Sequence, residues 1–243
     1  MKENQILAII QARMNSTRLP GKVLLPIGDS NAIQMIVDKC KANPLINETV
    51  IATEPKSETI IQYCNDNNLN CFIGDEEDVL KRVYSAASAF GANIVIDITS
   101  DCPFIDLSGL KLYLDLIKNK KADYVSNIIE RTFPDGLDLQ IYTFEALSRL
   151  YNLVSEPEYY QHTGWNFTRF QDRFKCTNIY APKELNWPEL RITLDTPEDY
   201  LLICAVNSCL NEPTPINIIG FLKSNPSVLE INNTVKAKTP GEL

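Results

Sequence analysis

Within the first hundred residues, four short apolar segments alternate with stretches of helical periodicity, and this alternation restricts the folds open to the chain. The apolar segments predict strands at 6–10, 49–53, 71–73 and 93–99. Apolar residues spaced three and four apart predict helices between them, at 31–42, 57–67 and 76–90. Strands that are connected through helices form parallel sheets covered on both faces. The predicted fold is therefore α/β, with a mixed, mostly parallel sheet and helices on both of its faces.

Beyond residue 106 the alternation is less regular. Further helices are predicted at 107–120, 143–153, 157–170 and 215–223, and extended segments at 137–141, 173–180 and 190–195. Thr196 and Pro197 form a helix start, with threonine as the N-cap and proline in the first turn, and the final residues are expected to fray. We expect a single domain over 1–243, in which 123–190 is an elaboration for acceptor binding or dimerisation.

The charge and composition argue against several classes of partner. Lys and Arg total 23 against 31 Asp and Glu, which gives a net charge of −8, whereas general nucleic-acid binding requires a basic face. No apolar run approaches the ~20 residues of a membrane helix, and the five at 6–10 are too few for a signal peptide. The seven cysteines form no CxxC pair, and the single histidine argues against a histidine-based zinc site. We expect a reduced, cytoplasmic protein without nucleic-acid or membrane partners.

A cation-rich loop directly follows the first predicted strand. Arg13, Arg18 and Lys22 fall within ten residues, among Asn, Ser, Thr and Gly. Arginine forks bind phosphate oxygens in pairs, lysine acts as a point charge, and the backbone N–H groups of such a loop can surround an anion. A basic loop can also be merely solvated, but ligands of open α/β sheets bind where this loop lies, at the carboxyl ends of strands. The loop is not a Walker A loop and contains no GxGxxG, so P-loop and dinucleotide-binding interpretations are weak.

Two aspartates 94 positions apart occupy the same predicted structural position. Asp101 follows the strand at 93–99, and Asp195 ends the extended segment 190–195 just before a helix. Carboxylates at strand ends are suited to hold Mg²⁺. Each aspartate could instead bond backbone amides in a turn or at a helix start. Two such carboxylates beside a cationic loop favour a site for a metal-bound triphosphate.

The segment 9–24, which reads IIQARMNSTRLPGKVL, resembles the opening motif of the cytidylyltransferases. The resemblance is strongest to the SpsF-type branch of spore-coat polysaccharide biosynthesis, and it extends to the CMP-Kdo and CMP-acylneuraminate synthetases. Further motifs continue it in the same order, at 74–82, 100–103, 123–127 and 194–199. Together these motifs cover most of residues 5–205.

This resemblance implies a Rossmann-like, nucleotide-diphospho-sugar transferase or GT-A-like fold, with CTP as the nucleotide donor. Arg13, Arg18 and Lys22 would hold the triphosphate, and Lys22, Arg13 and Asp101 would be the catalytic residues. Asp101 and Asp195 would match the family's Mg²⁺ ligands. Including backbone groups at the end of the first strand, the expected nucleotide-binding residues are Ala8, Gln11, Arg13, Arg18, Lys22 and Ser100.

The acceptor side is less evident from the sequence. The chain departs from the branch at Asn15, where glycine is frequent, and at 161–165, where only His162 remains of a Glu-His-Val-Thr-Pro-like run. Residues of the second half that could face a substrate, or serve only as surface or packing residues, are Arg131, Asp138, Gln140, His162, Arg169, Arg173 and Lys175. We expect acceptor binding by Gln140, His162, Arg169 and Arg173, with the two arginines as the first candidates because the acceptor is expected to be anionic.

The predicted activity is transfer of CMP from CTP to an acidic or phosphorylated acceptor, with release of pyrophosphate, for a surface polysaccharide such as a capsule, lipopolysaccharide or coat. The acceptor could be a sugar acid, a sugar phosphate or another phosphorylated metabolite. Two alternatives remain, a GT-A glycosyltransferase that uses a nucleotide sugar and a non-catalytic assembly protein that binds nucleotide. The absence of a clear DxD motif argues against the first, and the retained cations and aspartates argue against the second. The aromatic-rich stretch 123–180 also predicts a homodimer.

Overall fold

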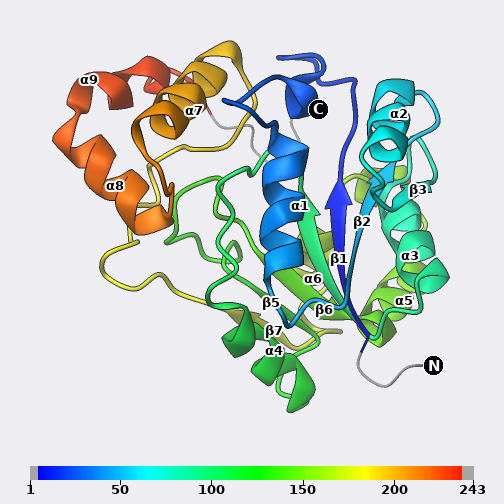
Figure 1. Ribbon diagram of the computed structural model, residues 1–243. Coiled ribbons are helices and arrows are strands. Elements are labelled where there is room, and N and C mark those ends of the chain that lie inside the picture. Colours follow the sequence, from blue (N-terminus) through cyan, green and yellow to red (C-terminus); the bar gives the residue numbers. More distant parts are fainter. Residues whose placement is uncertain (1–4, 237–243) are drawn as a thin grey trace.

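A seven-stranded sheet forms the centre of the computed structural model, which describes residues 5–236 (Figure 1). The strands are β1 (Ile6–Gln11), β2 (Glu48–Thr53), β3 (Cys71–Ile73), β4 (Ile94–Thr99), β5 (Tyr124–Ser126), β6 (Gln140–Thr143) and β7 (Cys176–Asn178). They lie in the order β3-β2-β1-β4-β6-β5-β7, and β6 runs antiparallel to both of its neighbours while the other pairs are parallel. The predicted mixed, mostly parallel sheet is confirmed.

Helices cover both faces of the sheet because the side chains of its central strands are apolar on both sides. On β1, Ala8 and Ile10 pack in one core while Leu7 and Ile9 pack in the other. The first core is closed by α1 (Ala32–Ala42), α2 (Glu58–Asp66) and α4 (Leu110–Lys118). The second core is closed by α3 (Val79–Ala89), α5 (Phe144–Leu153) and α6 (Thr163–Arg169).

A third core joins the C-terminal helices to the loops that follow β1 and β4. The helices are α7 (Pro197–Cys209), α8 (Pro215–Ser224) and α9 (Pro226–Leu229), which lie together at the upper left of Figure 1. Leu202 and Ile218 of these helices pack in one cluster with Ile27, Phe104 and Ile192. This packing fixes the segment before α7 against the carboxyl end of the sheet. Within the described residues, none of the helices has both the length and the apolarity that a membrane span needs.

Two predicted elements have different bounds in the structure, because a side chain or a neighbouring segment forms hydrogen bonds with their backbone groups. The predicted strand at 137–141 becomes β6 only from residue 140, since the Asn127 side chain bonds the carbonyl of Leu137 and the N–H of Leu139. The predicted helix 157–170 is interrupted between a 3₁₀ turn at Pro157–Tyr159 and α6, because the Tyr160 carbonyl accepts from Leu80 at the start of α3.

The C-terminal part contains one segment without strand pairing and two short helices that were not predicted. The extended segment 190–195 joins no strand of the sheet and forms one isolated bridge, between Arg191 and Asp135. After α8, α9 and a 3₁₀ helix at Glu230–Asn232 continue the chain, and Asn232 bonds Asp199. The final residues, 237–243, lie outside the described part of the chain.

The predicted helix start at Thr196 is confirmed and allows a stability test. The Thr196 hydroxyl accepts from the Asp199 N–H, and the Asp199 carboxylate accepts in return from the Thr196 N–H. We expect Thr196→Ala to lower the free energy of unfolding by about 1–2 kcal/mol, the usual loss for an N-cap. Urea unfolding of this variant beside Thr59→Ala, a threonine exposed on α2, tests the prediction. An equal loss in the two variants would contradict it.

Candidate active site

Two adjoining cavities open at the carboxyl ends of β1 and β4. We call them the large cavity, of about 550 Å³, and the small cavity, of about 220 Å³. Residues that line both are Gln11, Arg18, Thr99, Asp101, Gln161, His162 and Asp195. A molecule in one cavity would therefore meet a molecule in the other at Asp101 and Asp195.

Lys22 lies at this junction, held by the loop after β1. Gly21 has φ +69°, a left-handed conformation that glycine adopts readily, and it starts the 3₁₀ turn Lys22–Leu24. The Lys22 side chain, nearly buried, places Nζ 3.2 Å from Asp101 Oδ2 and 2.5 Å from Asp195 Oδ1. Burial alone would lower the pKa of Lys22, but the two carboxylates outweigh burial and raise it. Lys22 is thus a fixed ammonium between two carboxylates.

Backbone contacts bring Asp195 beside Asp101 although the sequence separates them widely. The Leu194 N–H and the Thr193 hydroxyl both donate to the Asp101 carbonyl, at 2.8 and 3.0 Å. Gly136 permits this approach, because its φ is +111° and any Cβ there would lie 2.7 Å from the backbone of Ile192. The isolated β-bridge between Arg191 and Asp135 also holds segment 190–195 against the loop between β5 and β6.

Three cations surround the Asp195 carboxylate. Arg18 and Arg191 approach it at 3.0 and 2.8 Å, in addition to Lys22. Burial would raise the pKa of Asp195, but Lys22 and Arg191 outweigh burial and lower it to about 2. Asp199, fully buried at the start of α7, orients the group by accepting from the Asp195 N–H and the Arg191 guanidinium. Asp195 is therefore ionised and immobilised at neutral pH.

The carboxylate pair is chemically suited to a divalent cation. The positively charged Lys22 ammonium lies between the two carboxylates, at the place where a divalent metal ion would bind them. Within residues 5–236, no three Asp, Glu, His or Cys side chains gather to form a protein-only metal site. Mg²⁺ commonly takes one or two carboxylates and completes its shell with substrate phosphates and water. The residues present fit that mode of binding.

The small cavity is cationic, as the sequence predicts for the loop after β1. Its lining includes the predicted residues Arg13, Arg18, Lys22 and Ser100. Arg82 on α3 also lines it and was not predicted, although it ends the motif at 74–82. Its side chain is buried and donates to the Asp75 carbonyl, while its Nε has no partner among the described residues. A buried cation with an unused donor in this position is suited to an anionic ligand.

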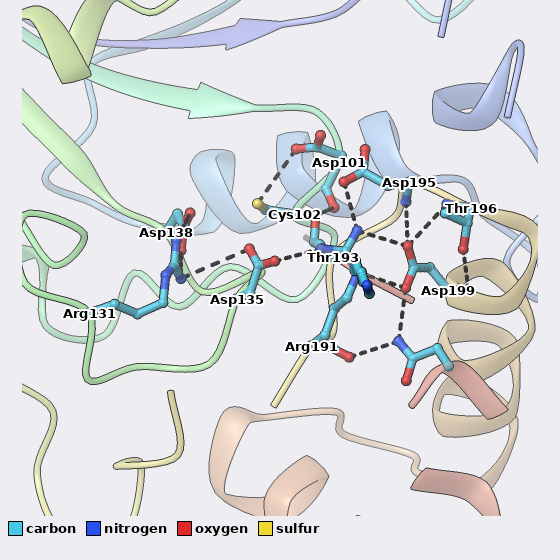
Figure 2. A network of polar contacts seen from close by, with 12 residues as sticks. Asp101, Cys102, Arg131, Asp135, Asp138, Arg191, Thr193, Asp195, Thr196 and Asp199 are labelled. Atoms are coloured by element: carbon cyan, nitrogen blue, oxygen red, sulfur yellow. Dashed lines mark hydrogen bonds and ion pairs between the residues drawn. The ribbon is translucent and has the colours of Figure 1, made fainter. Parts of the chain in front are cut away.

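The large cavity extends over the sheet toward α6 and contains a chain of alternating charges (Figure 2). The Arg131 guanidinium binds both oxygens of Asp138, at 2.7 and 2.9 Å. Asp135 lies between Arg131 and Arg191, 2.7 Å from the latter. Burial and the neighbouring Asp138 raise the pKa of Asp135 to about 6. The sequence analysis singled out Arg131 and Asp138 of this chain of charges, but neither Asp135 nor Arg191.

The structure brings only some of the predicted residues to the site. Gln140 and His162 line the large cavity, and burial lowers the pKa of His162. Ala8 lies fully buried in the middle of β1 and lines neither cavity. Arg169 stacks on Tyr159 and Trp165 and pairs with Glu158, and the exposed Arg173 pairs with Asp172. Ala8, Arg169 and Arg173 are therefore not part of either cavity lining.

Comparison with known proteins finds a matching family model and similar proteins. The family model described as Cytidylyltransferase matches residues 7–181. The spore coat polysaccharide biosynthesis protein SpsF of Bacillus subtilis is 30% identical, over 92% of this chain and 96% of its own. The 3-deoxy-manno-octulosonate cytidylyltransferase of Koribacter versatilis is 26% identical over 47% of this chain and 44% of its own. A solved cytidylyltransferase from Leptospira borgpetersenii is 27% identical, with a TM-score of 0.87 over 98% of this chain and 100% of that one.

The pKa of Asp195 predicts how stability depends on pH. This pKa lies below the ordinary value of 3.8, so the charged form stabilises the folded state, fully above about pH 4 and progressively less as the pH falls toward about 2. We expect Asp195→Asn to lower the free energy of unfolding by about 2 kcal/mol at neutral pH, and by less below about pH 4. Urea unfolding at several pH values measures this difference. A loss that stays constant down to about pH 3 would contradict the assignment.

Proposed function

Because the chain belongs to the cytidylyltransferase family, a family of CTP-dependent nucleotidyltransferases, we propose that it transfers CMP from CTP to an acidic or phosphorylated acceptor. The observation that carries this proposal is the position of Lys22, Asp101 and Asp195 at the junction of the two cavities. The small cavity would hold the nucleotide, and the large cavity the acceptor. Family membership also argues against the glycosyltransferase and non-catalytic alternatives.

The reaction needs positioning and charge neutralisation more than covalent chemistry from the protein. An oxygen of the acceptor attacks the α-phosphorus of CTP and forms the new P–O bond. The bond between the α-phosphorus and the bridging oxygen breaks, and its electron pair leaves with pyrophosphate. Arg13, Arg18 and Lys22 would neutralise the charge that develops on the leaving group. Arg82, with its unused Nε, would add a fourth cation to the nucleotide pocket.

Mg²⁺ would be held by Asp101 and Asp195, and when bound it would supply charge neutralisation and orient the phosphates. Arg191 and Asp199 would then act as positioning residues that keep the Asp195 carboxylate turned toward the junction. Arg18 would be shared between Asp195 and the triphosphate. Lys22 would exchange its carboxylate partners for phosphate oxygens as the nucleotide enters.

We place the acidic group of the acceptor at the junction, because Arg18 lines both cavities, as Asp101 and Asp195 do, and supplies a positive charge there. A sugar acid, a sugar phosphate or another phosphorylated metabolite would present such a group. The likeness to SpsF supports a role in making a surface polysaccharide, such as a capsule, lipopolysaccharide or coat. A cytoplasmic location and a homodimer that buries part of 123–180 belong to the same proposal.

Pyrophosphate release tests the proposed activity. We expect release from CTP in the presence of Mg²⁺ and a suitable acceptor, and less release from ATP, GTP or UTP. The shift in melting temperature with each nucleotide gives an acceptor-independent ranking. A preference for UTP or GTP in both measurements would refute cytidylyl transfer while leaving nucleotidyl transfer intact.

Replacement of Asp101 by Asn tests the role of the carboxylate pair. Asp101→Asn keeps the shape of the side chain but removes a charge, so we expect kcat to fall roughly 10²–10³-fold, as for loss of one preorganised stabilising group. The melting temperature should change little, because Lys22 keeps its contact with Asp195. The matched control is Asp115→Asn, which removes an exposed surface pair with Lys111. Full turnover in Asp101→Asn would identify Asp101 as a turn residue only.

A further inference from the structure

The floor of the large cavity contains a carboxylate for which the proposed mechanism has no use. On β4, Val95 packs in the core beneath α3 and α5, while Asp97 and Thr99, further along the same face, line the large cavity. Gln140 lies opposite Asp97 in the antiparallel register with β6 and lines the same cavity. The sheet face thus changes from apolar to polar where the cavity begins, and the Asp97 side chain is 1% exposed.

The hydrogen-bond partners of Asp97 are neutral. The Gln11 amide donates to one carboxylate oxygen and the Tyr142 hydroxyl donates to the other, at 2.8 Å for the tyrosine. Within the described part of the chain, no lysine, arginine or histidine forms an ion pair with Asp97. Arg82 attracts the Asp97 carboxylate electrostatically but does not contact it. Burial raises the pKa of Asp97. Because a buried carboxylate without a paired cation is costly, burial favours the protonated form of Asp97, and a cation in the cavity would stabilise its ionised form.

The arginines of the large cavity offer no charge to a second anionic group. Arg131 is occupied by Asp138, Arg191 by Asp135 together with two further carboxylates, and Arg18 by Asp195. His162 adds no reliable charge, because burial lowers its pKa. Carboxylates outnumber cations in the lining of this cavity. An acceptor with anionic groups at both ends would therefore meet repulsion away from the junction.

We propose that the acceptor is a zwitterion whose ammonium group pairs with Asp97, while its acidic end lies at the junction, where a phosphate oxygen, or a hydroxyl oxygen of a sugar acid, attacks CTP. An ammonium ion supplies the missing counter-charge, and Gln140 offers an amide oxygen on the same floor. The chemical class is a small phosphorylated amine or an amino-substituted sugar acid. This inference rests on the proposed cytidylyl transfer and specifies its acceptor.

The test compares acceptors that differ only in an ammonium group and a hydroxyl group. The pairs are 2-aminoethyl phosphate with 2-hydroxyethyl phosphate, phosphoserine with 3-phosphoglycerate, and 8-amino-8-deoxy-3-deoxy-manno-octulosonate with its 8-hydroxy parent. Pyrophosphate release gives kcat/KM for each acceptor with CTP and Mg²⁺. Binding is measured separately as a melting-temperature shift in the presence of the α,β-methylene analogue of CTP, which cannot react.

We expect the ammonium member to be favoured at least tenfold in one or more pairs, mainly through KM. Asp97→Asn should abolish that preference, because it should lower kcat/KM for the ammonium member more than for the hydroxyl member. Asp172→Asn, which alters an exposed aspartate outside the cavity, should keep the preference. The comparison within pairs uses the wild-type protein, so it decides the proposal even if Asp97→Asn fails to fold.

Three results would overturn the inference. The first is an absence of any preference within the pairs, in turnover and in binding, and the second is a preference for the hydroxyl members. The third is an ammonium preference that persists in a folded Asp97→Asn variant. If one of these results is obtained while the hydroxyl members are turned over with CTP, the proposed function stands and only this inference fails. If CTP neither binds nor releases pyrophosphate with any acceptor, the proposed function fails and this inference fails with it.

Discussion

The contact of the Lys22 ammonium with Asp101 and Asp195 is the interaction on which the site depends. It joins the loop after β1, the turn after β4 and the segment before α7, which come from distant parts of the sequence. Each carboxylate would repel the other without a cation between them. The same three groups are the ones that a metal-bound triphosphate would engage, so the free protein is organised around the charges that its ligand would replace.

An acidic protein can bind a polyanion only if its cations are concentrated locally, and the small cavity achieves this concentration. The net charge is −8, yet Arg13, Arg18, Lys22 and Arg82 all line this one space. The large cavity has the opposite character, because its arginines are already paired with aspartates and Asp97 has only neutral partners. The two cavities therefore favour ligands of different charge, with the junction as the point of contact.

Burial distinguishes the supporting residues from those that would meet ligands. Asp199 is fully buried and fully bonded, by Arg191, Asn232 and two backbone N–H groups, so it holds other residues in place. Asp97 is equally buried but faces a cavity and has no charged partner within the described residues. This difference in bonding, and not in residue type, separates a positioning residue from a candidate ligand contact.

The sequence by itself determined the α/β architecture, because the alternation of apolar strands and amphipathic helices reflects local periodicity and burial. It also determined the loop that contains Arg13, Arg18 and Lys22, the two aspartates at 101 and 195, and the start of α7 at Thr196, since each is a local pattern. Only the tertiary structure decided which side chains reach the cavities. Arg82 and Asp97 enter them, whereas Arg169 and Arg173 do not, because rings and carboxylates near them in the chain take up their charges. The placements of Arg82 and Asp97 depend on contacts between segments far apart in sequence, which leave no periodic signal, so these two could not be predicted from sequence.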